Sequence, residues 1–264
     1  MKIFTTGKSG TIGSKLPSRV KPIVCDLREI ARYPEKQDFI DSAIIHLAGI
    51  VGIEKVKEDV QYSEKVNIEY TMNLAQVVAK HRASKFIYIS SGHVYGNTEK
   101  HAIESQTLNP LTLYADQKCR AEEKLTNFFK ETATTLYILR VFSVIDLENK
   151  NNSTSLGSQL HKIISGNRDI WIYNGEDVRD FMSVNSVSEI LTKVAETFEP
   201  GGIYNVCSGT PMSVRELTNL TLEKNGIYNF SQIKDGFSSM KSNFGSRDKL
   251  ARTFLVDSTL KGAT

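Results

Sequence analysis

The feature that most constrains this chain is the regular alternation of short apolar segments with longer segments of helical period. Helical spacing of apolar residues predicts helices over about residues 60–81 and 114–130. The apolar segments have the length of strands and comprise residues 3–6, 22–25, 43–47, 86–90 and 136–141. Continuous apolar strands separated by helices are typical of a parallel sheet that is covered on both faces. The sequence therefore predicts an α/β fold with a doubly wound parallel sheet.

A polar, turn-rich stretch at residues 149–155 predicts a boundary between two parts, residues 1–148 and residues 149–264. We expect parts of the second half to pack back on the first and the remainder to form a small subdomain. From residue 226 onward the periodicity is poor and no element is assigned. Before it we expect helices over residues 156–165, 184–197 and 214–225, and strands over residues 170–173 and 204–206.

Composition excludes several classes of protein. Lys and Arg number 33 against 30 Asp and Glu, and 40% of the 264 residues are hydrophobic, which is too apolar for a disordered chain and too balanced to predict a nucleic-acid partner. No apolar run approaches the length of a membrane span, and the amino terminus lacks a signal-peptide core, so we expect a cytoplasmic protein. The three scattered cysteines predict reduced thiols, and the histidines lack metal-ligand spacing, so no metal site is expected.

Three glycines follow the first apolar segment, in the pattern Gly7-x-x-Gly10-x-x-Gly13. Glycines at this spacing, between a strand and a helix, allow the backbone to approach a pyrophosphate, and the amides near Thr11 and Ile12 would point at its charge. The sequence therefore predicts a dinucleotide site. A nucleoside-triphosphate loop is excluded because Lys2 stands where that loop requires its first glycine.

The distance from these glycines to the next acid is unusually short. Only 13 residues separate Gly13 from Asp26, where a dinucleotide fold commonly has about 20 before its ribose-binding acid. Either one strand–helix unit is abbreviated, or Asp26 is that acid on a short crossover. The basic residues of this gap predict a solvated surface or, alternatively, tolerance of a 2′-phosphate; they are Lys8, Lys15, Arg19 and Lys21.

Tyr114 and Lys118 lie one helical turn apart at the start of a predicted helix. A neighbouring ammonium lowers the pKa of a tyrosine, which would allow Tyr114 to act as an acid or base. Ser91 follows the fourth apolar segment, where the carboxyl end of a parallel strand meets ligands, and its hydroxyl can bond a substrate oxygen. In contrast, the segment 122–124 (EEK) predicts a solvated helix face.

Across about residues 1–215 the chain resembles the extended short-chain dehydrogenase/reductases of the nucleotide-sugar epimerase, dehydratase and reductase family. The order of the motifs carries this resemblance: the glycine loop, Asp26-Leu27, His46-Leu47-Ala48-Gly49, Asn67, SSGHVYG at 90–96, Tyr114-x-x-x-Lys118, Arg179-Asp180-Phe181 and YNVCSG at 204–209. The resemblance implies a Rossmann-type fold whose second strand–helix unit is abbreviated, a nucleotide-diphosphate sugar as substrate, and a homodimer as a possible assembly.

The resemblance also implies a role for each matching residue. Ser91, Tyr114 and Lys118 would be catalytic, and Ser91, Gly92, His93 and Arg179 would contact the substrate. NAD or NADP would be held by Tyr114 and Lys118 together with Gly7, Gly10, Thr11, Ile12, Gly13, Asp26, Leu27, Leu47, Ala48, Gly49 and Asn67. NADP is slightly favoured because cations populate the gap after the glycines. In this interpretation Asp26-Leu27 contacts adenine, which favours the abbreviated unit over a ribose acid.

Departures from the family pattern reduce the number of functions that the chain could have. Where the 4,6-dehydratases carry an Asp-Glu pair, this chain has Gly92 and His93, so dehydration is excluded. Three functions remain: NAD(P)H-dependent reduction of a nucleotide-linked 4-keto-(6-deoxy) sugar in surface-polysaccharide biosynthesis, a nucleotide-sugar 4-epimerase, and a non-catalytic dinucleotide-binding protein. An epimerase must retain its cofactor through a full cycle, whereas a short adenosine-binding half suits a cofactor that exchanges. We therefore favour the reductase.

Overall fold

The computed structural model describes residues 1–23, 39–148, 155–167, 169–236 and 238–255. Its centre is a six-stranded sheet in the order β2-β1-β3-β4-β5-β9, and every neighbouring pair is parallel. These strands are β1 (Lys2–Thr6), β2 (Val20–Pro22), β3 (Ser42–His46), β4 (Lys85–Ser91), β5 (Thr135–Val141) and β9 (Gly202–Val206). The predicted doubly wound α/β fold is confirmed.

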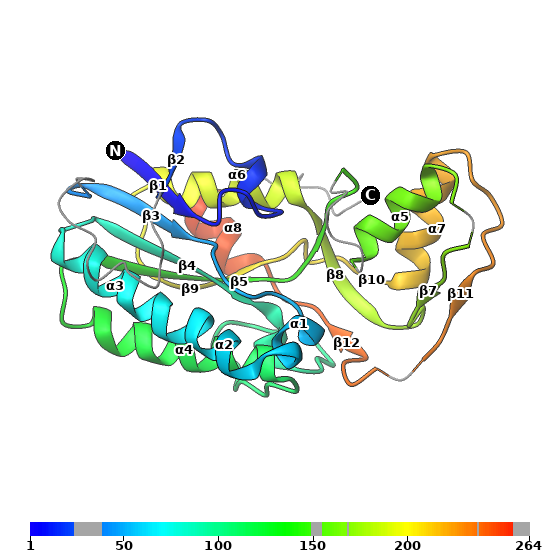
Figure 1. Cartoon of the computed structure of the whole chain (residues 1–264), viewed down its shortest axis with the longest axis horizontal. Helices are drawn as coiled ribbons and strands as arrows, with labels where there is room; N and C mark the ends of the chain where they lie inside the picture. Colours follow the sequence, from blue (N-terminus) through cyan, green and yellow to red (C-terminus); the bar gives the residue numbers. More distant parts are fainter. Residues whose placement is uncertain (24–38, 149–154, 168, 237, 256–264) are drawn as a thin grey trace.

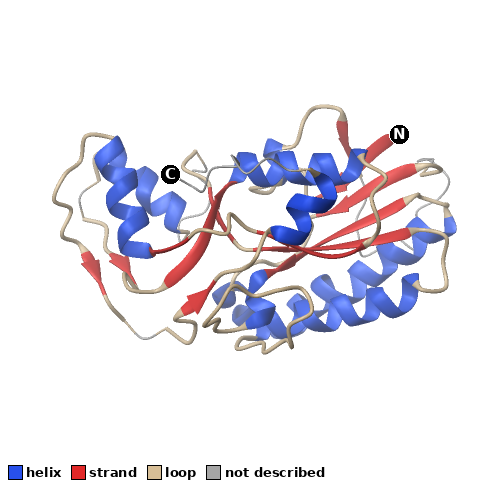
Figure 2. Cartoon of the chain, turned by 180° about the vertical axis from the view of Figure 1, so that it is seen from behind, coloured by secondary structure: helices blue, strands red, loops and turns tan. Residues whose placement is uncertain are grey.

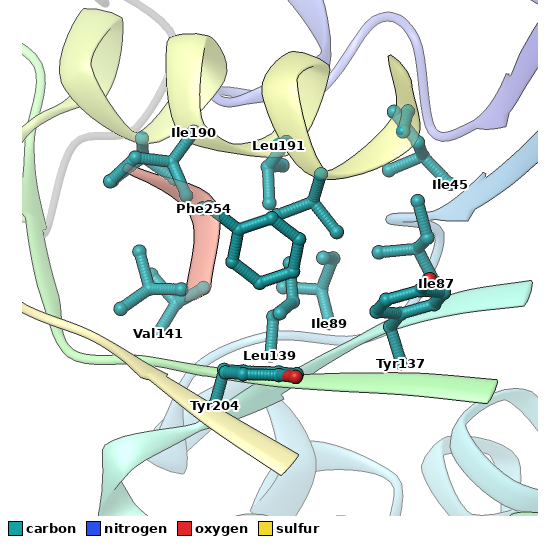
Figure 3. Close-up of a cluster of buried hydrophobic side chains, with 14 of the residues drawn as sticks. Ile45, Ile87, Ile89, Tyr137, Leu139, Val141, Ile190, Leu191, Tyr204 and Phe254 are labelled. Carbon is teal, nitrogen blue, oxygen red and sulfur yellow. The ribbon is translucent and has the colours of Figure 1, made fainter. Parts of the chain in front are cut away.

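Helices cover both faces of this sheet (Figure 1). On one face, α3 (Thr71–Lys80) and α4 (Leu113–Phe129) bury Leu74 and Leu125 against Ile44 and Phe86. On the other face lie α6 (Val184–Glu196) and α8 (Asp248–Phe254). Figure 3 shows Ile190 and Leu191 of α6 above Ile45, Ile87 and Leu139 of the sheet, with Phe254 of α8 beside them. Adjacent strand residues point to opposite faces, so continuous apolar strands fill both layers.

The crossover from β1 to β2 is short, whereas residues 24–38, which follow β2, lie outside the described residues, so the abbreviation of the second strand–helix unit stays a prediction. Between β1 and β2 the only helix is a three-residue 3₁₀ turn, η1 (Gly13–Lys15). The full helix expected to open at the glycine loop is absent because Leu16, which precedes Pro17, is extended (φ −64°, ψ 140°), as the residue before a proline prefers. The second strand begins at Val20, two residues before the predicted start, and Cys25, Asp26 and Leu27 lie outside the described residues.

The helix predicted over residues 60–81 is interrupted. A short helix α1 (Ile53–Glu58) precedes α2 (Val60–Glu64), and a π-helical turn, η3 (Lys65–Tyr70), connects α2 to α3. The side chain of Asp59 accepts a hydrogen bond from the Tyr62 amide at 2.8 Å and caps α2. Single π-turns inside helices are frequent at functional sites, and this one turns Asn67 inward, where it is buried.

The second half of the chain contributes to both lobes (Figure 1), which Figure 2 shows from behind. Strand β9 and helices α6 and α8 complete the large sheet, whereas α5 (Leu156–Ile164) and α7 (Val214–Lys224) form the smaller lobe with short strands. These strands are β6 (Ser143–Ile145), β7 (Ile172–Tyr173), β8 (Val178–Ser183), β10 (Pro211–Ser213), β11 (Ile233–Lys234) and β12 (Ser242–Asn243). The unassigned segment after residue 226 therefore supplies β11, β12 and α8.

Candidate active site

Tyr114 and Lys118 lie on the buried face of α4, near its amino terminus. The side chain of Thr112 accepts a hydrogen bond from the Ala115 amide at 3.2 Å and begins the helix at a defined residue. Lys118 is 7% exposed, and its Nζ donates to the Ile89 carbonyl oxygen at 2.7 Å. That bond holds the ammonium against β4, with Nζ 6.0 Å from the ring centroid of Tyr114.

Ser91, the last residue of β4, completes a cluster with Tyr114 and Lys118. Burial raises the pKa of Tyr114 to about 12, and a hydrogen bond with the Ser91 side chain opposes this shift. The sequence predicted a pKa lowered by the Lys118 ammonium; the net shift is upward instead, because burial dominates. The phenol is protonated near neutral pH, as an unperturbed tyrosine also is.

His93 and Arg179 lie beside this cluster. The His93 ring meets that of Tyr114 edge-on, with centroids 6.0 Å apart. Burial, followed by the charge of Arg179, lowers the pKa of His93 to about 4, so the imidazole is neutral at pH 7. Its Nδ1 is buried and has no hydrogen-bond partner in the described part of the chain. Arg179 donates to Asp177 at 3.1 Å and to the Met240 carbonyl at 2.5 Å, so much of its donor capacity is used within the protein.

Gly92 is required by packing. A Cβ at this position would lie 2.6 Å from the ring of Phe142, which stacks on Tyr95. A side chain at position 92 would therefore collide with the ring of Phe142.

The glycine loop packs against the turn that follows β3. Gly7 has a φ of +68°, and a Cβ there would lie 2.8 Å from the Ala48 amide nitrogen, so only glycine fits. The loop therefore contacts Leu47 and Ala48 at the carboxyl edge of β1 and β3, where open α/β sheets bind ligands. Gly10 is exposed, and a Cβ on it would meet only the Gly7 carbonyl oxygen, at 3.3 Å. A dinucleotide can approach the loop on this side.

A buried hydrogen-bond network fixes that edge. The Thr6 hydroxyl accepts from the amides of Leu47 at 3.2 Å and Ala48 at 3.1 Å, so its one proton is given to Nδ1 of His46, 2.7 Å away. The Nε2 of His46 therefore carries the ring proton and donates to Thr71 at 2.9 Å. Burial, and then the charge of Lys118, lowers the pKa of His46 to about 3. His46 is a neutral structural residue.

Asn67 uses its amide within the protein. Its Oδ1 accepts from the Ile50 amide at 2.8 Å, and its Nδ2 donates to the Ile50 carbonyl at 3.1 Å and to Gln117 of α4 at 2.8 Å. The π-helical turn thus ties the turn after β3 to the helix that carries Tyr114. Asn67 therefore holds in place the turn after β3, which forms part of the predicted cofactor-binding edge.

Cations of the gap after the glycines also have partners. Lys8 donates to the Leu16 carbonyl at 2.7 Å and caps the 3₁₀ turn. Lys15 pairs with Glu148, and Arg19 pairs with Glu196 at 2.8 Å. These interactions agree with the interpretation of this gap as a solvated surface. They argue against a 2′-phosphate site at Lys8, Lys15 and Arg19.

Two residues near the site escaped the sequence analysis. Asn243 of β12 is 1% exposed and donates to the Gly92 and Gly96 carbonyls, both at 2.9 Å, so it clamps the 90–96 segment. No sequence signal could place it, because the pairing partner lies about 150 residues away. Glu122 was predicted to be solvated, which is wrong: it is 4% exposed and paired with Arg140. Its position one turn after Lys118 was the available signal.

Two further features bear on the class of protein. Within the described ranges, no cluster of three or more His, Cys, Asp or Glu side chains has a geometry that could hold a metal ion. Within the same ranges, none of the helices has the length and apolar character needed to cross a membrane.

A parallel sheet with a glycine loop after its first strand, and a Ser–Tyr–Lys cluster at the end of its fourth, is the architecture of the extended short-chain dehydrogenase/reductases. The chain belongs to the NAD dependent epimerase/dehydratase family, whose model matches residues 3–207. It is 29% identical over 238 residues to GDP-6-deoxy-D-mannose reductase of Pseudomonas aeruginosa, covering 83% of this chain and 78% of the relative. A probable UDP-arabinose 4-epimerase of Arabidopsis thaliana is 27% identical, covering 80% of this chain and 57% of the relative.

Solved structures share the fold. The P. aeruginosa protein RMD, complexed with NADPH, superposes with a TM-score of 0.82 at 24% identity, covering 96% of this chain and 92% of that one. A UDP-glucuronic acid 4-epimerase from Bacillus cereus, in complex with UDP-glucuronic acid and NAD, has a TM-score of 0.83 at 20% identity, covering 99% and 95%. A protein that binds NADPH and an epimerase that binds NAD thus share this backbone, and the fold alone does not identify the reaction.

Proposed function

We propose that this protein reduces the ketone of a nucleotide-linked 4-keto-(6-deoxy) sugar with NADH or NADPH. The observation that carries the proposal is the cluster of Tyr114, hydrogen-bonded to Ser91, with Lys118 one helical turn away, buried at the carboxyl edge of the sheet. Reduction of a ketone places negative charge on its oxygen, and a proton donor at that oxygen is what the step requires.

Each of the three residues of the cluster has its own role in the proposed reduction. The Ser91 hydroxyl bonds the carbonyl oxygen of the substrate, and Tyr114 donates its proton to the same oxygen as charge develops there. Lys118 supplies the positive charge that favours the resulting phenolate. When bound, the nicotinamide cofactor supplies the hydride; Gly7, Gly10, Thr11, Ile12 and Gly13, with residues 47–49, would hold it.

His93 and Arg179 are proposed to face the sugar and its diphosphate. Arg179 keeps a positive charge close to the cluster, although it also bonds Asp177. The neutral His93, with its unpartnered Nδ1, replaces the acid of a dehydratase and offers a hydrogen-bonding group without a charge. Loss of water from the sugar needs an acid and a base at positions 92 and 93, and this chain has neither.

The relatives support the reductase and keep the epimerase as the alternative. The reductase from P. aeruginosa is matched over most of both chains, and the adenosine side of the present fold has only a three-residue turn between β1 and β2. A cofactor held by so short a unit is suited to exchange between turnovers. The probable UDP-arabinose 4-epimerase, matched at 27% identity over a shorter share of its length, is the reason for testing both reactions.

The experiment offers the purified protein NADPH or NADH with GDP-4-keto-6-deoxymannose, and separately with UDP-4-keto sugars. Loss of absorbance at 340 nm, with a product heavier by two hydrogens in mass spectrometry, is the expected result. Formation of a sugar epimer with no net consumption of reduced cofactor, by protein that carries tightly bound NAD, would establish the epimerase instead. The ratio of kcat/KM with the two cofactors measures the NADP preference.

A further inference from the structure

Glu122 lies one helical turn beyond Lys118 on α4, so Tyr114, Lys118 and Glu122 form a stripe along one buried face of the helix. A carboxylate that is 4% exposed is costly unless it is paired and hydrogen-bonded. The buried carboxylate of Glu122 is stabilised by the hydrogen bonds that both of its oxygens accept.

Both oxygens of Glu122 are bonded to neighbouring strands of the sheet. One oxygen accepts from the hydroxyl of Ser90, the residue before Ser91 on β4. Arg140 of β5 donates its Nε to both oxygens, at 3.1 and 3.2 Å, and its terminal nitrogen to Oε2 at 2.7 Å. The carboxylate thus joins the helix that carries Tyr114 and Lys118 to the strand that carries Ser91.

Arg140 is itself fully engaged. Its other terminal nitrogen donates to the Tyr95 hydroxyl at 2.8 Å and to the Glu104 carbonyl at 3.2 Å. Tyr95 donates in turn to Asn205 at 2.8 Å. The ion pair is therefore part of a satisfied network that runs beneath the 90–96 segment, which explains how two charges are tolerated in the interior.

Glu122 also affects the pKa of Lys118, because its carboxylate lies near that ammonium. In the part of the chain that the structure describes, the titratable groups that face this ammonium are Tyr88 of β4, whose ring centroid lies 4.7 Å from Nζ, His46 of β3, and Tyr114 and Glu122 of its own helix. Glu122 is the only carboxylate among them. Burial lowers the pKa of Lys118 to about 8, and the charge of Glu122 opposes that shift. Tyr88 and His46 are uncharged near neutral pH because burial raises the pKa of Tyr88 and lowers that of His46.

We propose that Glu122 is a positioning residue that keeps Lys118 protonated and holds the Tyr114–Lys118 turn against the strand of Ser91. This inference rests on the proposed function for its effect on turnover, whereas the charge of Lys118 is a property of the protein alone. Glu122 touches neither substrate nor cofactor in this account; it acts through Lys118 and Ser90.

The test compares Glu122→Gln with Glu123→Gln, an exposed neighbour on the same helix, in protein labelled with ¹³C at the ε-carbon of lysine. NMR titration follows Lys118, whose signal is assigned by its loss in Lys118→Arg. We expect a midpoint near pH 8 in the wild type and about one pH unit lower in Glu122→Gln, the smaller end of the effect of a nearby opposite charge. Glu123→Gln should match the wild type.

The pH dependence of kcat/KM supplies the second readout. The high-pH limb should move with the Lys118 midpoint, so that Glu122→Gln loses about fivefold in kcat/KM at pH 8, the loss that a one-unit shift of a group titrating near 8 produces. A purely structural role would lower kcat without moving this limb. An unmoved NMR midpoint in folded Glu122→Gln overturns the proposal whether or not the protein is a reductase.

Glu122→Gln leaves Arg140 without its partner and can fail to fold, so Glu122→Gln/Arg140→Met is the second variant. Replacing both members of a buried pair is often neutral for stability. Its Lys118 midpoint should lie below the wild-type value, and equality with the wild type contradicts the proposal. Normal titrations with no reduction of any keto sugar would instead refute the proposed function.

Discussion

Glycine has two roles in the glycine loop: at Gly13 the packing leaves no room for a side chain, and at Gly10 the missing side chain leaves the exposed face open to a cofactor. Alanine substitutions at the two positions test these roles separately. A Cβ at Gly13 would overlap the carbonyl oxygen of Gly7 and lie 2.9 Å from two backbone carbons of Gly7 and Lys8. Because the obstacle is backbone, the loop must move, and overpacking of this kind costs about 1–3 kcal/mol. For a chain of this size each kcal/mol lowers Tm by about 2–4 °C, so Gly13→Ala should melt roughly 2–12 °C below the wild type.

Gly10→Ala is the matched substitution in the same loop. Its Cβ would meet only the Gly7 oxygen, at 3.3 Å, a contact that a shift of a few tenths of an ångström relieves, so Gly10→Ala should lower Tm by less than Gly13→Ala does. Its methyl group would stand on the exposed side, so binding of NADH or NADPH should weaken. Thermal melts by circular dichroism and isothermal titration with both cofactors measure the two effects. A wild-type Tm for Gly13→Ala, or equal destabilisation by the two variants, would refute the division of roles.

Three further predictions concern the cluster and its supports. Tyr114→Phe should retain no more than about 1% of kcat in the 4-keto sugar assay while folding normally, since general acid catalysis contributes about 100-fold or more; a variant with near-normal kcat would exclude the phenol as proton donor. Burial lowers the pKa of His46 from 6.5 to about 3. Between these pH values His46 is protonated in the unfolded chain but neutral in the folded protein. Its contribution to the free energy of unfolding is complete above pH 6.5 and falls as the pH drops, by up to about 1.4 kcal/mol per unit; urea unfolding at pH 7 and 5 should show a smaller loss for His46→Gln. The carboxylate of Asp180 accepts two backbone amides of the turn after β9, at 2.6 and 2.8 Å, so Asp180→Ala should cost about 1–3 kcal/mol per amide left unpaired, measured by the same method.

The fold was largely predictable because its signals are local. Strand-length apolar runs and helical spacing located the large sheet and its main helices to within a few residues. The missing helix after the glycine loop has a local cause as well: Pro17 stops it at a single turn. The short strands of the smaller lobe have two or three residues in most cases, too few to show a period.

The site was predictable in its members but not in its electrostatics. The helical spacing of Tyr114 and Lys118, and the position of Ser91 at a strand end, placed the three together. The sequence predicted a lowered pKa for Tyr114 and missed the net rise that burial causes, because desolvation depends on the whole environment of a group. The spacing of four residues from Lys118 places Glu122 on the inner face of the helix, but the sequence could not identify Arg140, the partner on β5 that makes its burial tolerable.

The sequence by itself therefore determined which elements form, where the dinucleotide-type loop lies and which three side chains meet. Those properties follow from contacts between residues near one another in the chain, and from the rule that carboxyl ends of parallel strands share an edge. Only the tertiary structure decided the protonation states of the cluster and the clamp of Asn243 on the 90–96 segment. Both depend on groups brought together across the sheet, and on the water that their packing excludes.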